Sequence, residues 1–367
     1  MSFAAKLIAW QRRHGRRGLP WQGTRDPYRV WLSEVMLQQT QVATVIPYYT
    51  RFLEKYPSAE ALAAASQDDV LRLWSGLGYY ARGRNLHKAA GEIALSGFPR
   101  TSSRIEQLPG VGRSTAAAIA VFAFGERAAI LDGNVKRVLS RHFAASGDLW
   151  PLAERLLPRK GVETYTQALM DLGATVCTRT PSCAACPVKA GCAARKAGRI
   201  HELPARRTRK PLPQREATWF VHMHKSEVLL ERRASHGLWG GLLCFPERSL
   251  VKGKTAQLPP LEHGFTHFRL RIHPVRVDVT RATGTGWMAL DAALGAAVPA
   301  PVRTLLRELR SAAQGARAER PARAAPAFLR AAAAEARPGG RSPMRRNRAG
   351  AGARAATGAR RSRARAA

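Results

Sequence analysis

Residues Leu108 to Ala120 read LPGVGRSTAAAIA, a pattern that predicts a helix, a tight glycine turn and a second helix. Gly110 and Gly112 can adopt backbone angles that are closed to other residues. Because neither carries a side chain, a phosphate could approach the backbone N–H groups at the start of the second helix. An ordinary pair of antiparallel helices fits the same pattern, so this segment alone leaves a nucleic-acid contact and a purely structural turn both open.

The sequence on both sides of this turn is helical. Between Pro27 and Ile200, apolar residues recur three and four positions apart. Phe3, Leu7 and Trp10 show the same spacing, which favours an amphipathic helix docked on the rest of the protein over a mitochondrial transit peptide. Strand signals are scarce here, so we expect an all-α region. Its helices should break near Pro57, Gly76, Pro99, Gly110, Gly125 and Pro158.

The pattern changes after residue 200. Residues 201–216 contain several prolines with basic neighbours, which is typical of an exposed linker. The segments ATWFVHMH, EVLLERR and FRLRIHPVRVDVT then combine β-branched and aromatic residues with partial alternation, so residues 217–310 are expected to form a smaller α+β domain. Residues 311–367 are mostly Ala, Arg, Gly and Pro and lack the large apolar residues that a core needs. We predict that this basic tail is disordered.

The net charge indicates a polyanionic partner. The chain of 367 residues has 60 Lys and Arg against 25 Asp and Glu, which gives a formal charge of +35. No apolar stretch is long enough to span a membrane, so nucleic acid is the expected partner. The tail holds 14 Arg and 2 Glu. Most of the excess positive charge therefore lies in the body of the protein.

Four of the five cysteines, Cys177, Cys183, Cys186 and Cys192, lie within 16 residues. Their crowding indicates one shared ligand. Nothing at the N-terminus resembles a secretory signal, so a metal site is favoured over a set of disulfides. The spacing C-x5-C-x2-C-x5-C is too compact for two separate zinc knuckles. Four thiolates in one short loop suit a [4Fe-4S] cluster best, and a tetrahedral zinc site is the alternative.

Together, the glycine turn, the segment LDGNVKRVL at residues 131–139 and the four cysteines resemble the helix-hairpin-helix DNA glycosylases of the endonuclease III superfamily. Three further segments narrow the resemblance to the MutY family of adenine glycosylases: VWLSEVMLQQTQV (30–42), GLGYYARGRNLHKAA (76–90) and GLWGGLLCFP (237–246). The resemblance covers about residues 1 to 310. In one respect the chain departs from the family pattern, because five residues instead of the usual six separate Cys177 from Cys183.

This resemblance implies a mostly α fold in which residues 1–200 form the glycosylase domain with a [4Fe-4S] loop, followed by a Nudix-like domain at 217–310. It implies an enzyme of base-excision repair that hydrolyses the N-glycosidic bond of adenine opposite 8-oxoguanine or guanine in double-stranded DNA. We expect a cytoplasmic, nucleoid-associated monomer of bacterial type with no membrane partner. A mismatch or oxidised-pyrimidine glycosylase/lyase and a non-enzymatic DNA-binding iron–sulfur protein are the alternatives.

Two carboxylates suit this chemistry. Breaking a purine N-glycosidic bond needs a proton donor for the base and an anion that stabilises the positively charged sugar. Glu34 shares a helix face with Val30 and Leu37, so desolvation should raise its pKa, although a solvent-facing Glu would fit the local pattern too. Asp132 directly precedes GNVKRVL and should cap that helix. By resemblance, Glu34 protonates adenine N7, Asp132 stabilises the sugar cation and Asn134 hydrogen-bonds in the site.

Ser114 determines the expected reaction subtype. In bifunctional relatives the matching position is a lysine whose amine forms a Schiff base and leads to strand cleavage. Serine cannot do this. The chain is therefore predicted to be monofunctional and to leave an abasic site.

The resemblance also assigns DNA contacts. An adenine inside a duplex has to be extruded before it can react, and Gln38, Gln39 and Tyr79 match residues that enter the base stack. The remaining matches are contacts to the flipped adenine by Gln167, with Trp21 beside it, and contacts to 8-oxoguanine by Phe265, Thr266 and His267. The family commonly has serine where Thr266 stands. The second domain lacks the acidic residues of a Nudix box, so we expect it to bind the lesion without hydrolysing a pyrophosphate.

Overall fold

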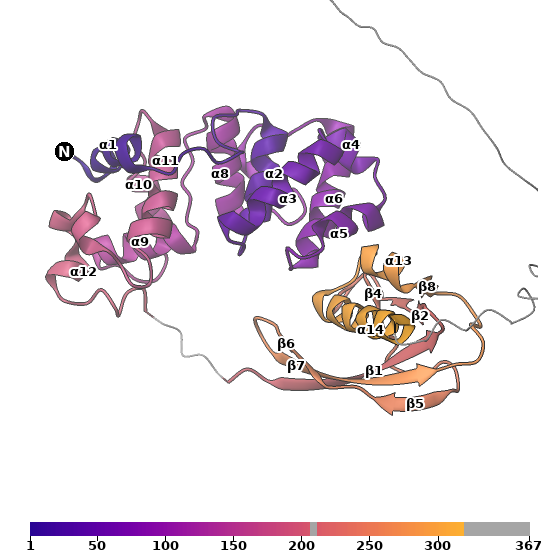
Figure 1. Ribbon diagram of the computed structural model, residues 1–367. Helices are drawn as coiled ribbons and strands as arrows, with labels where there is room; N and C mark the ends of the chain where they lie inside the picture. Colours follow the sequence, from indigo (N-terminus) through magenta and orange to yellow (C-terminus); the bar gives the residue numbers. More distant parts are fainter. Residues whose placement is uncertain (206–210, 319–367) are drawn as a thin grey trace, which may run out of the picture. The chain divides into compact units, whose positions relative to one another are not determined.

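The computed structural model describes residues 1–205 and 211–318, and its first part is helical (Figure 1). The helices lie close to where the sequence places them, with turns at the expected Gly and Pro positions. Short 3-10 turns and one π-turn, η1, occur in the cysteine region. The helices are α1 Phe3–His14, α2 Pro27–Leu37, α3 Val42–Lys55, α4 Ala59–Ala63, α5 Gln67–Trp74, α6 Tyr80–Ser96, α7 Ser102–Ile105, α8 Arg113–Phe124, α9 Gly133–Phe143, α10 Trp150–Arg155, α11 Val162–Asp171 and α12 Ala193–Lys196, and η1 is Leu172–Val176.

Local sequence explains where the helices of the active region begin and end. Asp26 caps α2 by accepting hydrogen bonds from the next backbone N–H groups, and Pro27 occupies the first helical position, where its missing N–H costs nothing. Helix α8 ends at Phe124 because Gly125 takes the left-handed conformation with φ +70°. The start at Pro27 and the break near Gly125 were predicted from the sequence, whereas the cap by Asp26 was not.

Two hydrophobic clusters hold the helical part together. The first includes Trp31 of α2 and Trp74 of α5, and the second includes Leu7 of α1, Val135 of α9 and Tyr165 of α11; all five of these side chains are at most 1% exposed. Helix α8 contributes small residues to both clusters. The predicted docking of the N-terminal helix is confirmed. Helices α2 and α9, which carry the two predicted catalytic carboxylates, thus belong to different clusters that α8 connects.

The second part is built on a mixed sheet. Its strand order is β5-β7-β1-β2-β8, with β6 paired to β7, and β3 and β4 form a separate pair. Strands β1 and β7 run parallel from the pair Gln214/Arg269 to Met223/Asp278, and the other pairs are antiparallel. The elements are β1 Gln214–His224, β2 Glu227–Leu229, β3 Glu231–Arg232, β4 Leu243–Cys244, β5 Lys254–Gln257, β6 Leu261–Gly264, β7 Arg269–Asp278, β8 Trp287–Ala289, α13 Leu290–Gly295 and α14 Ala300–Ala318.

Helix α14 covers this sheet and completes its core (Figure 1). Leu305 and Leu306 pack in one cluster with Trp219 of β1 and Ile272 of β7. Because α14 continues to Ala318, ordered structure extends past residue 310, where the sequence was expected to become disordered. The rest of the predicted tail, residues 319–367, lies outside the described residues.

The expected linker, residues 201–216, is also shorter than predicted, since strand β1 already begins at Gln214. Residues 206–210 lie outside the described residues. Among residues 1–205 and 211–318, no helix combines the length and the apolar character needed to cross a membrane.

Candidate active site

An open groove of about 1460 Å³ collects most of the residues that the sequence singled out in the helical part. It is lined by α2, α8, α9, α11 and the loop that follows α1. Side chains that lie far apart in the sequence thus face one space. The predicted site residues that line it are Trp21, Glu34, Gln38, Gln39, Ser114, Asp132, Asn134 and Gln167.

Glu34 is placed in the groove among apolar neighbours. Val30 and Leu37 of the same helix line the groove beside it. Burial raises the pKa of Glu34 from its ordinary value of 4.5 to about 8, and the negative charge of Asp132 adds to the shift. The carboxyl therefore keeps its proton at neutral pH. The predicted rise of this pKa is confirmed.

Asp132 is held at the start of α9. Its Oδ1 accepts a hydrogen bond of 2.7 Å from the backbone N–H of Val135, so the predicted cap is confirmed. The partial positive charge of the helix N-terminus favours an anion at this position. Ser114 of α8 supports the same segment, because its Oγ accepts a hydrogen bond of 3.0 Å from the N–H of Leu131. The carboxylate is thus fixed from both its own helix and the neighbouring one.

Asn134 is fixed by residues that the sequence did not single out. Its Oδ1 accepts a 2.7 Å hydrogen bond from the guanidinium of Arg137, which also donates to the carbonyl oxygens of Gly173 at 2.6 Å and Cys177 at 2.7 Å. A Cβ on Gly173 would lie 2.6 Å from the Cβ of Asn134. A glycine inside a helical pattern is a signal of such a close approach, so Gly173 could have been found in the sequence.

The predicted wedge residues occupy strained turns beside the groove. Gln39 and Tyr79 have backbone φ angles of +57° and +47°, which residues other than glycine rarely adopt. Tyr79 is 44% exposed, unusual for a large aromatic residue in this protein. Strain of this kind concentrates at functional sites because the surrounding structure has to maintain it.

Arg82 maintains both turns. Its guanidinium donates to the carbonyl oxygens of Val35, Met36 and Gln38 and to Thr40 Oγ1, and it lies 5.1 Å from the centre of the Tyr79 ring. Burial lowers the pKa of Arg82 to about 10, so it stays charged at neutral pH. One half-buried cation thus links the turn after α2 with the turn before α6. No local pattern in the sequence distinguishes Arg82 from the many other arginines of the chain.

The glycine turn before α8 is confirmed, but its two glycines differ. Gly110 has φ +78°, and a Cβ there would lie 2.8 Å from the Cβ of Asn85. Gly112 has an ordinary φ of −97°, so its expected special backbone angle is wrong. Apart from its chain neighbours, no atom of the described residues lies within 4 Å of the position that a Gly112 Cβ would take. This glycine caps α8 and leaves space in front of the helix N-terminus.

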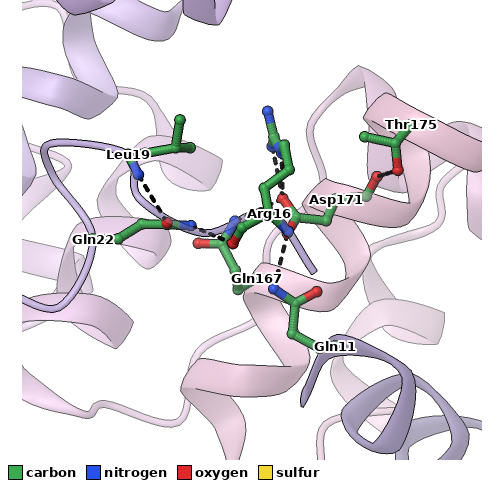
Figure 2. Close-up of polar contacts among 7 residues, drawn as sticks. All are labelled: Gln11, Arg16, Leu19, Gln22, Gln167, Asp171 and Thr175. Carbon is green, nitrogen blue, oxygen red and sulfur yellow. Dashed lines mark hydrogen bonds and ion pairs between the residues drawn. The ribbon is translucent and has the colours of Figure 1, made fainter. Parts of the chain in front are cut away.

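Asp171, which the sequence did not identify, is buried and bonds to residues of the groove wall. Gln167 donates a hydrogen bond of 2.9 Å from its Nε2 to Asp171, and Arg16 of the loop after α1 pairs with the same carboxylate at 2.7 Å (Figure 2). Trp21 of this loop packs edge-on against Tyr49, with 5.4 Å between ring centres. The predicted base-contacting residues are therefore held in place by α11 and α3.

The four cysteines of the loop surround one small cavity of about 30 Å³. This exceeds the roughly 10–15 Å³ that one water-sized sphere occupies. In the part of the chain that the structure describes, no three His, Cys, Asp or Glu side chains are grouped closely enough to hold a single metal ion. The four thiols therefore line one shared cavity. Arg141, 5% exposed, donates to Cys177 Sγ at 3.5 Å and to the Thr178 carbonyl at 2.6 Å.

The predicted lesion-contact residues form the tip of the β6–β7 hairpin. The N–H of Phe265 donates to the carbonyl of Phe268 at 2.9 Å, and the two rings stack with 4.4 Å between their centres. This leaves Thr266 and His267 exposed, with 3.4 Å between the hydroxyl and Nδ1. The hairpin thus presents a hydroxyl and an imidazole on a rigid aromatic base.

Comparison with known proteins is consistent with this arrangement. Residues 32–160 match the family of HhH-GPD superfamily base excision DNA repair proteins, and residues 217–308 match the NUDIX domain. An adenine DNA glycosylase of Buchnera aphidicola subsp. Baizongia pistaciae is 33% identical over 339 residues, which is 84% of this chain and 97% of that protein. The chain belongs to the adenine DNA glycosylases. The resemblance to the MutY family is confirmed, and with it an enzyme that hydrolyses N-glycosyl bonds in base-excision repair.

Other members and a related structure agree. The human adenine DNA glycosylase is 46% identical over 217 residues, covering 53% of this chain and 40% of the human protein. The structure of a thermostable thymine-DNA glycosylase is 30% identical, with a TM-score of 0.50, and covers 53% of this chain and 95% of that one. The predicted fold class, a helical glycosylase region followed by a Nudix-like α+β domain, is confirmed. Like other adenine DNA glycosylases, the protein binds DNA.

Proposed function

We propose that the protein excises adenine opposite 8-oxoguanine or guanine and that it does so without cleaving the DNA strand. The observation that carries this proposal is the pair of carboxyl groups in the groove. Glu34 is protonated because its pKa is raised to about 8, and Asp132 is held at a helix N-terminus that favours its anion. One proton donor and one anion facing the same space are what glycosidic hydrolysis requires.

The two groups divide the reaction between them. Glu34 gives its proton to the extruded adenine, which makes the base a better leaving group as its bond to the sugar breaks. The sugar then carries positive charge, and the Asp132 carboxylate stabilises it. A water molecule adds its oxygen to the sugar carbon, and its released proton restores Glu34. Adenine and an abasic site are the products. Asn134, oriented by Arg137, lies where it can hydrogen-bond in the same site.

Ser114 supports a monofunctional reaction. Its hydroxyl accepts the N–H of Leu131 and supports the segment that carries Asp132. A hydroxyl cannot form the Schiff base with the opened sugar that strand cleavage by a glycosylase/lyase requires. We therefore assign Ser114 a supporting role beside the anion and expect no lyase activity.

Recognition of the opposite base is assigned to two places. Tyr79, Gln38 and Gln39 are proposed to enter the base stack, an assignment supported by the strained and exposed turns that carry them. Thr266 and His267 are proposed to contact 8-oxoguanine, because they are exposed at the tip of a hairpin stiffened by two stacked phenylalanines. On this view the NUDIX-like domain binds the lesion and carries out no hydrolysis.

A [4Fe-4S] cluster is proposed for the four cysteines. The cavity between their side chains and the buried Arg141 beside Cys177 support it, since an arginine next to thiolates offsets their negative charge. When bound, the cluster would cross-link the loop from Cys177 to Cys192 and take no part in the hydrolysis. Lys189 of this loop and Arg195 and Lys196 of the following helix α12 are exposed. They would contact DNA phosphates, so binding should weaken as salt rises.

One gel assay tests this proposal. A labelled duplex with adenine opposite 8-oxoguanine is incubated with the protein and analysed with and without alkali. Scission only after alkali is expected. Scission without alkali, trapped as a covalent complex by borohydride, would instead identify a glycosylase/lyase. Binding without any scission would indicate a non-enzymatic protein. The variant Ser114→Lys provides the internal control, because it should introduce trappable scission.

A further inference from the structure

Asp171, the last residue of α11, is a fully buried carboxylate that bonds to three residues lining the groove. It is 0% exposed and accepts hydrogen bonds from three residues (Figure 2). Gln11 Nε2 lies 2.8 Å from Oδ2, the backbone N–H of Arg16 lies 2.9 Å from Oδ2, and Gln167 Nε2 lies 2.9 Å from Oδ1. The guanidinium of Arg16 forms the ion pair. Both carboxylate oxygens are therefore occupied by donors.

This carboxylate determines which way the Gln167 amide points. An ionised carboxylate accepts hydrogen bonds and cannot donate one. Gln167 must therefore turn its NH2 group towards Asp171, because its carbonyl oxygen in that position would face a negative charge. The carbonyl oxygen, attached to the same carbon, points to a different side. Among the residues that the structure describes, no donor is bonded to this oxygen, and Gln167 lines the groove.

A fixed acceptor in the groove would distinguish purines by their 6-position. Adenine has an amino group there, which donates, whereas guanine has a carbonyl oxygen, which accepts. We propose that Asp171 is a positioning residue that locks the Gln167 amide with its oxygen towards the base, so that the groove selects a 6-amino purine over a 6-oxo purine. This inference rests on the proposed function, in which Gln167 contacts the extruded adenine.

A purely structural role for Asp171 is the competing explanation. The same carboxylate also anchors Gln11 of α1 and Arg16 of the following loop, so its loss could simply loosen the groove wall. Loosening would slow the excision of every base by a similar factor. Loss of the amide orientation would instead change the ratio between bases, because a free amide can turn its NH2 group towards a 6-oxo purine. The ratio is therefore the informative readout.

The experiment measures single-turnover excision from three duplexes that carry adenine, purine or hypoxanthine opposite 8-oxoguanine. Purine has hydrogen at the 6-position and hypoxanthine has oxygen. The proteins are the unaltered chain, Asp171→Asn, Gln167→Ala and the double variant. Asn at 171 can donate to the Gln167 oxygen, so the adenine-to-hypoxanthine rate ratio should fall about 10-fold or more, as expected for a site that loses one oriented hydrogen bond. Gln167→Ala should lower the ratio similarly, and adding Asp171→Asn to it should change the ratio no further.

Gln11→Ala serves as the matched control, since it removes another donor to Asp171 without touching Gln167. It should leave the ratio unchanged. Asp171→Asn leaves the half-buried Arg16 cation without its partner, which is destabilising. If that variant does not fold, the pair Arg16→Met with Asp171→Asn removes both charges and should show the same loss of ratio. Two results would overturn the inference. In the first, Asp171→Asn slows the excision of all three bases equally. In the second, Asp171→Asn still changes the adenine-to-hypoxanthine rate ratio when Gln167 has already been replaced by alanine. Failure of the unaltered protein to release adenine would contradict the proposed function instead.

Discussion

Replacing Glu34 by Gln should make the protein inactive and, at alkaline pH, more stable. The folded state raises the pKa of Glu34 from 4.5 to about 8 by burial and by the charge of Asp132. In the unfolded chain this group ionises above pH 4.5, whereas in the folded protein it keeps its proton up to about pH 8. The contribution of Glu34 to stability is therefore complete below pH 4.5 and is lost progressively as pH rises to 8.

The size of this loss follows from the shift. One pKa unit corresponds to about 1.4 kcal/mol. The shift of Glu34 therefore lowers the free energy of unfolding at alkaline pH by at most about 5 kcal/mol. Glu34 is open to the groove on one side, so solvent screens part of the cost of its ionisation. We therefore expect this loss of stability to be roughly 2 kcal/mol. Gln has nearly the same shape and no ionisation. Glu34→Gln should thus be more stable than the unaltered protein by about this amount at pH 9 and equal to it near pH 5.

The same substitution that increases stability at alkaline pH should decrease the rate of excision. Loss of a general acid costs about 100-fold or more in rate, so Glu34→Gln should bind a duplex with adenine opposite 8-oxoguanine but release adenine at least that much more slowly. The unaltered protein should lose activity as pH rises above about 8, since Glu34 then gives up its proton.

Denaturant unfolding between pH 5 and 9, together with single-turnover excision over the same range, tests these expectations. Glu92→Gln, at an exposed position of α6, is the matched control and should change neither quantity. A Glu34→Gln variant that is no more stable at pH 9, or that excises adenine at the normal rate, would refute the reasoning about this residue.

Three further changes probe other parts of the site. Arg82→Lys keeps the charge but loses most of the contacts that fix the turns of Gln38 and Tyr79. The rate of adenine excision opposite 8-oxoguanine should fall about 10-fold. The control Arg104→Ala, at an exposed position, should leave this rate unchanged. Gly173→Ala forces a Cβ to within 2.6 Å of Asn134, so it should cost about 2 kcal/mol in unfolding experiments and slow single-turnover excision. Elemental analysis of the unaltered protein should find iron and acid-labile sulfide in equal amounts. Cys186→Ser should abolish both and weaken DNA binding. An unchanged iron content in this variant would contradict the cluster assignment.

Local patterns in the sequence were sufficient for most element boundaries, whereas the two carboxylates were singled out by the family resemblance together with their local setting. Glu34 lies on a helix face with apolar neighbours, and Asp132 stands directly before a helix, so burial and capping could both be expected and both are observed. The helix ends at Gly125 and near Pro57 follow from backbone constraints that act within a few residues. The strands with clear β-branched patterns, β1 and β7, were found for the same reason.

Residues that act through long-range contacts could not be predicted from local patterns. Arg82, Arg137 and Asp171 resemble any other charged helical residue until folding brings their distant partners to them. The short strands β4, β5, β6 and β8 depend on pairing across the sheet and carry too few residues for a periodic pattern. The extension of α14 to Ala318 was missed because leucines earlier in the helix anchor it, while its last turns are composed mainly of Ala and Arg like the tail.

Direct detection of the released base tests whether this protein is a hydrolytic adenine glycosylase with specificity for the mispair. A duplex carrying radiolabelled adenine opposite 8-oxoguanine is incubated with the protein, and the small-molecule fraction is separated by chromatography. We predict free adenine in amounts equal to the abasic sites formed, and none from the same adenine opposite thymine. Absence of free adenine from the 8-oxoguanine duplex, or equal release from both duplexes, would contradict the account.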